Sequence, residues 1–455
     1  SSIKEVYEVT RQEYAEIART IDELTEERID AITGPGEGIT VYNTTGFERD
    51  DLVVLGDCGA DYLEDEFGNR YPVQKTSKGA QAFVYGIPSK GSRVFAPGAY
   101  AEGEKAEESP FTWNGSVLET PYYRVSIDEN GLFTGMYDKE FDREILQEGK
   151  CGNLFRMYED KPIYYDNWDI DIYYTEKSWD VTDVRRMEWK EMGPVRCTLY
   201  LERAVSNSLI CQEISFYADT RRIDFETKVD WKEHQHLLKV HFPVDVHTDE
   251  ATFDIQFGNI TRKTHTNTSW DAARFESCGQ KWIDVSEGHY GVSLMNDCKY
   301  GHSVRDSIIG LTLIKSGIEP NPTTDQEEHF FTYSLYPHGE TWREAGTVKQ
   351  SYFLNQPMYA AKGGEAGEKT CLVSVDQPNV VIETVKRAED GDGMIVRLYE
   401  SDNARTKAVL TVDGEILSAE ECNLLEEKEG DMTHSGSQMP FVIKPYEIKT
   451  YRIRR

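Results

Sequence analysis

The sequence predicts a mainly β protein, in which smaller β-units flank a large antiparallel β-sandwich and one amphipathic helix comes first. Short runs of alternating apolar and polar residues recur from Ile39 onward, for example YRVSID, VRCTLYLERAV and RIDFETKVDW, and such alternation is typical of strands with one buried face. Turn sequences such as ENG, GNR and DGE separate these runs. Because the sequence has no internal repeat of about 40 to 50 residues, the pattern favours sandwiches over a propeller.

The first residues of the chain, 2–32, are expected to form the only long helix. Ser2 and Glu5 have the spacing of a capping box, and the TGPGEG sequence at 33–38 ends the helical pattern. Such an amphipathic helix needs a surface against which its apolar stripe can pack. We expect its original helical partners to lie upstream of Ser1, and the exposed stripe to permit a homo-oligomer. The stripe consists of Ile3, Val6, Tyr14, Ile17, Ala18, Ile21, Leu24 and Ile32.

Two charge-rich links divide the β-part of the chain. AEGEKAEESP follows an expected small β-domain at 39–105, and AAKGGEAGEKT leads into the last strands of an expected C-terminal β-domain at 356–455. Between them, 111–355 is expected to form the large sandwich, and 1–33 is interpreted as the remnant of a helical domain. A length of 455 residues is enough for about three domains with cores of their own.

The composition narrows the classes of partner. Hydrophobic residues make up 38% and charged residues 29% of the chain, as in folded proteins that dissolve in water. Fifty Lys and Arg against 81 Asp and Glu give a formal net charge of −31, which would repel nucleic acid. No apolar run reaches the roughly 20 residues of a membrane-spanning helix, and no segment has the order of a signal peptide. We therefore expect neither a nucleic acid nor a membrane as partner.

The eight cysteines are scattered singly, without any C-x-x-C pair. This spacing indicates neither a zinc cage nor a disulfide framework. We expect reduced thiols and a cytoplasmic location.

A first candidate site is YYDNWDIDIYY at 164–174. If this segment is a strand, Asp169 and Asp171 lie on one face, where two carboxylates could bind a cation or flank a glycosidic bond. The alternative is a solvated strand edge. Trp168 between Asp166 and Asp169 favours a carbohydrate site, because aromatic faces stack on sugar rings and carboxylates accept hydrogen bonds from hydroxyl groups. Asp166, Trp168 and Asp169 are therefore candidate substrate-binding residues.

A second candidate site is NDCKYGH at 296–302, where polar side chains surround a glycine turn. One interpretation places Asn296, Asp297, Lys299 and Tyr300 at the mouth of a substrate cleft. The other is an ordinary hairpin loop, in which Asn296 and Asp297 fix the turn.

The histidine-rich segment KEHQHLLKVHFPVDVH contains His234, His236, His241 and His247. An H-x-H pair on one strand face can ligate zinc, but His241 would lie on the face opposite His236, and no cysteine completes a set. We expect satisfied or exposed histidines here, and no metal ligand. The chain also has no G-x-S-x-G, P-loop or H-E-x-x-H motif.

Many ordered segments resemble the C-terminal β-half of the bacterial-type α-mannosidases of glycoside hydrolase family 38, and together they extend over nearly the whole chain. The resemblance implies a galactose mutarotase-like super-sandwich in an enzyme that hydrolyses terminal α-mannosyl residues and retains the anomeric configuration. The segments are ETPYYRVSIDENG, GNLFRMYEDKP, WDIDIYY, HQHLLKVHFPVDV, NTSWDAARFE, SEGHYGVSLMNDCKYGH, WREAG and PYEIKTYRI.

In that family, an N-terminal α/β barrel supplies a zinc ion, an aspartate nucleophile and an aspartate acid/base. A zinc-ligating segment of the type N-Q-F-H-D-x-x-P-G leads into a sequence like SSIKEVYE, which is where this chain starts. The resemblance therefore implies that the barrel, the nucleophile, the acid/base and every zinc ligand are absent from this chain, so no catalytic residue is expected in it. The expected partners are an α-mannoside or oligosaccharide substrate and the missing barrel.

The resemblance also implies that the large sandwich scaffolds the active site and lends loops to its rim. The loops DNWDID (166–171) and NDCKYGH (296–302) are then expected to lie near each other and to carry the rim residues. A stand-alone carbohydrate-binding module is an alternative, and a purely structural sandwich whose loops form an interdomain interface is another. The unpartnered helix at 2–32 favours the enzyme fragment. The expected rim residues are Asp166, Trp168, Asp169, Asn296, Asp297, Lys299 and Tyr300.

Overall fold

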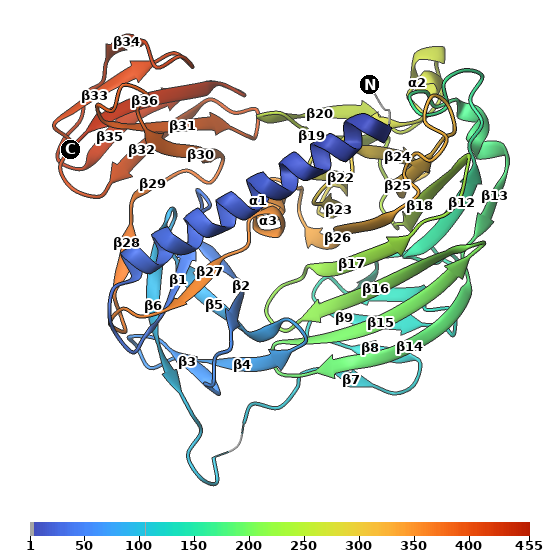
Figure 1. Cartoon of the computed structure of the whole chain (residues 1–455), viewed down its shortest axis with the longest axis horizontal. Helices are drawn as coiled ribbons and strands as arrows, with labels where there is room; N and C mark the ends of the chain where they lie inside the picture. Colours follow the sequence, from blue (N-terminus) through green and yellow to red (C-terminus); the bar gives the residue numbers. More distant parts are fainter. Residues whose placement is uncertain (1–3, 105) are drawn as a thin grey trace. The chain divides into compact units, whose positions relative to one another are not determined.

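The computed structural model describes residues 4–104 and 106–455, which are mainly β, as the sequence predicts (Figure 1). The chain divides into two compact units. Unit 1 comprises Ser1–Ala31, Glu108–Asp254 and Thr261–Thr347, and unit 2 comprises Ile32–Glu107, Ile255–Ile260 and Val348–Arg455. Each unit is therefore built from three separate stretches of the chain.

Unit 1 contains three antiparallel sheets. The largest has nine strands in the order β14-β15-β16-β17-β26-β23-β22-β19-β20. Its strands are β14 (Asp183–Met192), β15 (Arg196–Val205), β16 (Ser208–Tyr217), β17 (Ile223–Asp230), β26 (Glu328–Gly339), β23 (Tyr290–Asn296), β22 (Trp282–Glu287), β19 (Glu250–Ile255) and β20 (Gly258–Lys263).

The second sheet has six strands in the order β13-β12-β18-β25-β24-β21, and the third has five in the order β11-β10-β9-β8-β7. The six are β13 (Ser178–Asp180), β12 (Leu154–Glu159), β18 (His236–Pro243), β25 (Ile308–Ser316), β24 (Gly301–Arg305) and β21 (Ser277–Cys278). The five are β11 (Arg143–Glu144), β10 (Phe133–Asp138), β9 (Tyr123–Ile127), β8 (Val117–Glu119) and β7 (Thr112–Trp113).

The three sheets of unit 1 share one hydrophobic core. Phe225 of β17 is fully buried. Its ring lies 5.9 Å from that of Phe133 on β10, 5.5 Å from that of Phe242 on β18, and stacks on Tyr333 of β26 at 4.8 Å. One side chain thus contacts all three sheets, and the expected large antiparallel sandwich is confirmed.

Unit 2 has an eight-stranded sheet in the order β2-β5-β4-β3-β6-β1-β27, with β28 paired to β6. Its strands are β1 (Ile39–Asn43), β2 (Arg49–Gly56), β3 (Tyr62–Glu64), β4 (Arg70–Thr76), β5 (Gly79–Ile87), β6 (Gly91–Gly98), β27 (Tyr359–Lys362) and β28 (Lys369–Cys371).

A three-stranded and a five-stranded sheet complete unit 2, and their strands share a second core. The three are β29 (Val373–Val375), β32 (Thr406–Val412) and β35 (Gln438–Ile443). The five are β30 (Val380–Arg387), β31 (Met394–Glu400), β36 (Ile448–Arg454), β33 (Ser418–Cys422) and β34 (Lys428–Asp431).

Helix α1 spans Lys4–Thr33, which confirms the expected N-terminal helix; Ser2 of the expected capping box lies outside the described residues. No described residue of α1 is buried. The large apolar side chains remain exposed, up to 67% for Tyr14. The helix therefore presents a stripe of exposed apolar side chains: Val6, Tyr7, Val9, Tyr14, Ile17, Ile21, Leu24 and Ile32.

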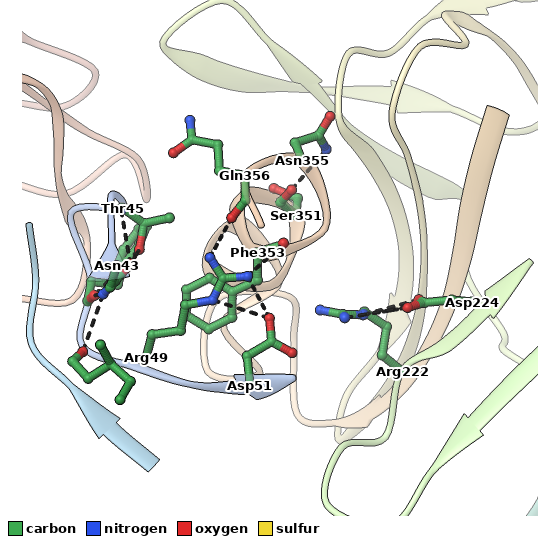
Figure 2. Close-up of polar contacts among 12 residues, drawn as sticks. Asn43, Thr45, Arg49, Asp51, Arg222, Asp224, Ser351, Phe353, Asn355 and Gln356 are labelled. Carbon is green, nitrogen blue, oxygen red and sulfur yellow. Dashed lines mark hydrogen bonds and ion pairs between the residues drawn. The ribbon is translucent and has the colours of Figure 1, made fainter. Parts of the chain in front are cut away.

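In unit 2, Arg49 closes the C-terminal end of α3 (Thr347–Asn355) (Figure 2). Its guanidinium donates to the carbonyl oxygens of Phe353 (2.8 Å) and Gln356 (2.5 Å), and to Asp51 Oδ2 at 2.6 Å. The Arg49 and Asp51 side chains are almost completely buried. The last carbonyl groups of a helix have no partner within the helix. The planar guanidinium gives one of them, that of Phe353, and the carbonyl of Gln356 just after the helix a donor, and it also neutralises Asp51.

We predict that Arg49→Ala lowers the free energy of unfolding of unit 2 by about 3–5 kcal/mol, because it removes the positive partner of a buried carboxylate. Far-UV circular dichroism during urea unfolding measures the change. All eight tryptophans lie in unit 1, so their emission serves as an internal control and should follow the wild-type curve. The exposed Arg185→Ala is a matched control, with an expected change of about 0.5 kcal/mol or less. An unchanged unfolding midpoint for Arg49→Ala contradicts the capping role.

Candidate functional site

The segment at 164–174 is a loop followed by the short 3-10 helix η1 (Ile172–Glu176), so the expected strand is wrong. The backbone turns back at Tyr165, whose carbonyl oxygen accepts the amides of Trp168 (2.8 Å) and Asp169 (3.0 Å). Asp171 accepts the amide of Ile163 at 2.9 Å. Asp side chains that bond to nearby backbone groups favour turns over strands. Asp169 and Asp171 therefore do not form the pair on one strand face that alternation predicted.

Asp166 anchors this loop. Its carboxylate is buried and accepts the amides of Glu319 (2.7 Å) and Ile318 (2.9 Å), and the Gln235 side-chain amide at 3.1 Å. Burial raises the pKa of Asp166, but the hydrogen bonds from Glu319, Gln235 and Ile318 and the charge of Lys315 together hold its pKa below the usual value. Asp166 is thus an ionised side chain whose oxygens already have donors within the protein.

The anchored loop exposes a group of large apolar side chains. Trp168 is 55% and Tyr165 54% exposed, and their rings lie 5.5 Å apart. Asp169 is exposed beside them, and its carboxylate accepts the next amide, that of Ile170. Exposed aromatic clusters on an ordered loop are typical of binding surfaces. The cluster comprises Ile163, Tyr164, Tyr165, Trp168, Ile172 and Tyr173.

The second loop, NDCKYGH, connects β23 to β24. Asn296 is 1% exposed, and its side chain accepts the Lys299 amide at 2.6 Å and donates to the Gln280 carbonyl at 3.1 Å. Asp297 is exposed and accepts the amide of Thr332 at 2.9 Å. Asn296 and Asp297 therefore shape the turn.

Two further side chains of the second loop differ in their surroundings. Burial lowers the pKa of Lys299, whose ammonium lies 4.6 Å from the centre of the Phe331 ring. Tyr300 is 54% exposed. Of the four residues predicted here, Asp297 and Tyr300 are the most accessible.

Both loops border the connection between β25 and β26. Asp166 bonds to the start of this connection, and Asn167 donates to the carbonyl of Asn321 at 3.2 Å. On the other side, Asp325 lies near the end of the same connection; burial raises its pKa, and Lys299 of the second loop is close enough for its charge to oppose that increase. Residues 317–327 therefore link the two loops that the sequence singled out.

A buried charge cluster holds the first loop from behind. Lys239, on β18, is fully buried and donates to Glu276 and, at 2.8 Å, to Ser303. Glu276 also accepts the hydroxyl groups of Tyr174 (2.7 Å) and Thr312 (3.2 Å). Tyr174 belongs to η1, directly after the first loop. The sequence prediction missed Lys239, although a lysine within the apolar run HLLKVHFP is an unusual feature that marks it.

His241, two residues further along β18, is neutral at neutral pH. Burial lowers its pKa to about 3, with smaller contributions from the charges of Lys239 and Arg156. Its Nε2 lies 2.9 Å from the Tyr158 hydroxyl. Among the described residues, one set of three, Asp325, Glu327 and His329, has potential metal-ligand atoms within 4.8 Å of one another.

Comparison with protein families gives two matches. The "Glycosyl hydrolases family 38 C-terminal domain" matches residues 118–323, and the "Glycosyl hydrolases family 38 C-terminal beta sandwich domain" matches residues 379–451. The fold and the matched regions define the C-terminal β-domains of a glycosidase. The chain belongs to glycoside hydrolase family 38.

Similar curated proteins include Alpha-mannosidase G of Dictyostelium discoideum, 35% identical over 74% of this chain and 32% of the relative. Human Alpha-mannosidase 2C1 is 32% identical over 91% of this chain and 39% of the relative. The chain thus spans about a third to two fifths of the length of these relatives.

The crystal structure of an alpha-mannosidase from Enterococcus faecalis V583 superposes on the chain with a TM-score of 0.75 and 18% identity. The superposition covers 100% of this chain and 61% of that one. At this identity, the likeness supports the fold. Within the part of the chain that the structure describes, no helix has the length and apolar character needed to cross a membrane.

We predict that Asp166→Ala increases amide hydrogen exchange at Ile318 and Glu319 and throughout the first loop, because it removes the acceptor of two backbone amides. Asp169→Ala, in the same loop, is the matched control and should leave exchange at Ile318 and Glu319 unchanged, because the Asp169 carboxylate accepts the neighbouring amide of Ile170 and not these two. Since the folded pKa of Asp166 is depressed, its stabilising effect is present above the ordinary pKa of an Asp, near 3.9, and is lost as the pH falls through the folded value. Equal exchange in the two variants contradicts the anchoring role.

Proposed function

We propose that the chain is the non-catalytic C-terminal portion of a zinc-dependent, retaining α-mannosidase that hydrolyses terminal α-mannosyl residues. The observation that carries this proposal is the pair of family 38 matches in sequence order, at 118–323 and 379–451. The names of the longer relatives, which are alpha-mannosidases, support the substrate class. In this proposal the catalytic barrel of the longer protein and the α-mannoside are the partners of the chain.

The two loops bordering residues 317–327 are proposed to form part of the rim of the sugar pocket. Trp168 offers a ring face for stacking, and Asp169 and Tyr300 offer accessible polar groups for sugar hydroxyls. Asp166 and Asn296 are already bonded within the protein and hold the loops in place. Asp297 and Lys299 support the second loop.

The catalytic groups are proposed to lie outside the matched domains. A retaining glycosidase needs two carboxylates about 5–5.5 Å apart, one as nucleophile and one as acid/base. When bound, zinc in such an enzyme holds sugar hydroxyls and stabilises developing charge.

Asp325, Glu327 and His329 do not fit the role of zinc ligands. Arg11 already pairs with Glu327, and the charges of Lys299 and Lys315 already act on Asp325. An added divalent cation would have to displace or tolerate these positive groups. We therefore propose no zinc ligand in this chain.

A cytoplasmic location is proposed from the cysteines. All eight are free, and two of them, Cys278 and Cys298, are exposed. Free exposed thiols are typical of proteins in reducing compartments.

A stand-alone carbohydrate-binding module is the second candidate. The aromatic cluster at 163–173 supports it, because the contacts of Asp166 and Tyr174 that order this loop come from unit 1 of the chain itself. Such a module would bind sugar without any catalytic partner.

One experiment tests the enzyme proposal and the role of the rim. We expect the longer protein to hydrolyse an aryl α-mannoside and to lose this activity when a chelator removes zinc, whereas the 455-residue chain alone has none. Trp168→Ala in the longer protein should lower kcat/KM about 2- to 10-fold, the cost of a lost stacking contact. Trp270→Ala, at a more exposed tryptophan in α2 (Ser269–Ala273), is the matched control with unchanged kcat/KM. Zinc-stimulated turnover by the 455-residue chain contradicts the assignment of the catalytic groups.

We further propose that the 455-residue chain self-associates through the exposed apolar stripe of α1. Ile17→Asp should shift sedimentation of this chain towards the monomer, because it places a charge within the stripe. Ala15→Asp adds the same charge on the opposite side of the helix and should leave the distribution unchanged. A chain that stays monomeric at high concentration rules out this association.

A further inference from the structure

Unit 1 contains a cavity of about 430 Å³ between α1 and the connection that links the two candidate loops. Its volume lies in the range of small-molecule pockets, about 300–1,000 Å³. One wall comes from the first turns of α1, with Tyr7 and Arg11, and the other from Asn321, Asp325 and Glu327. The cavity therefore combines an aromatic ring with amide, carboxylate and guanidinium groups.

The charges that line the cavity balance. Lys4 and Arg11 are positive, Asp325 and Glu327 are negative, and Arg11 pairs directly with Glu327. A phosphate would gain no net attraction here, nor would a divalent cation. The lining thus favours a neutral ligand that can donate hydrogen bonds to the carboxylates and accept them from the positively charged groups.

Two polar groups on the loop wall remain available to such a ligand. The carboxylate of Asp325 is partly buried and has no hydrogen-bond donor among the described residues. The Nδ2 of Asn321 donates to no described residue, although Asn321 Oδ1 and the Asn321 carbonyl are both engaged. By contrast, Thr323 and Thr324 already donate their hydroxyl groups to Asn321.

The burial of Asp325 makes a missing donor costly. Burial raises the pKa of Asp325. The charges of His329, Lys299 and Lys315 lower it and that of Glu327 raises it, but the net result is a pKa above the usual value of an Asp. A ligand hydroxyl that donates to this carboxylate would offset part of the desolvation cost through a charge-assisted hydrogen bond.

We propose that this cavity is a monosaccharide-binding subsite, in which Asp325 accepts and Asn321 donates hydrogen bonds to hydroxyl groups of a neutral hexose and Tyr7 packs against the ring. The proposal deepens the proposed function and rests on it for the identity of the hexose as a mannosyl residue. The floor of the subsite is the same connection to which Asn167 is bonded. The first turns of α1 are thus part of the sugar-binding surface, in addition to the two candidate loops.

Saturation-transfer NMR of the 455-residue chain with methyl α-mannoside tests the proposal. We expect saturable binding, weakened about five- to tenfold by Asp325→Asn because a charge-assisted hydrogen bond becomes a neutral one. Asp306→Asn, at an exposed turn outside the cavity, is the matched control and should bind as the wild type does.

Two tyrosine variants of α1 test the proposed contact between Tyr7 and the sugar ring. Tyr7→Ala should weaken binding about two- to tenfold, whereas Tyr14→Ala should not, because Tyr14 is exposed on the same helix but does not line the cavity. These helix variants alter no buried side chain, so a loss of binding cannot be attributed to loss of the sandwich.

Three results overturn the subsite. They are equal binding by Asp325→Asn and the wild type, no saturable binding of methyl α-mannoside, and displacement of the sugar by inorganic phosphate or by zinc alone at this cavity. If the longer protein hydrolyses an aryl α-mannoside and the chain binds no sugar here, the subsite is wrong and the proposed function stands. If sugar binds with the expected dependence on Asp325 and Tyr7 but the longer protein is inactive, the proposed enzyme fails and the subsite stands.

Discussion

The organisation of the candidate site depends on the pairing of one buried ammonium group, that of Lys239. Strand alternation directs Leu238 and Val240 into the sandwich core and leaves Lys239 on the other face of the six-stranded sheet. An unpaired charge at this depth would be very costly, so Glu276 must lie against the sheet. Glu276 in turn binds the hydroxyl group of Tyr174, and the loop that carries Trp168 is thereby held at its C-terminal end.

The two loops divide their polar residues between support and contact. The Asp166 carboxylate accepts backbone amides of another segment, and the Asn296 side chain binds the Lys299 amide of its own loop and the Gln280 carbonyl. Trp168, Asp169 and Tyr300, by contrast, remain accessible. This division explains why aromatic and acidic residues occur together in these loops. A long exposed loop keeps one conformation only if some of its polar groups bind the rest of the protein. Two aspartates three positions apart, Asp166 and Asp169, therefore have different roles.

Much of the fold was predictable from the sequence, because strand alternation and helical spacing are local. The helix at 4–33, the β-rich remainder and the large sandwich all follow from such patterns. The conformation of 164–174 was not predictable, because Asp166 is fixed by amides about 150 residues further along the chain. The Lys239–Glu276 pair and the cavity at Asn321–Glu327 likewise join residues whose proximity only the tertiary structure determines. The residue types of the two loops could be recognised in the sequence, but the conformation of the loops could not be predicted from it.

The order of strands in the eight-stranded sheet has a consequence for biosynthesis. β1 is hydrogen-bonded to β6 on one side and to β27 on the other, with Ile39 opposite Lys362. More than half of the chain separates these two neighbours, so the loop-closure entropy of this pairing is large. A ribosome that synthesises the chain from its N-terminus completes every strand of the sandwich before β27 emerges. The eight-stranded sheet is therefore completed only after the sandwich strands have been synthesised. Until then β1 has one unpaired edge, which the nascent chain must protect from aggregation.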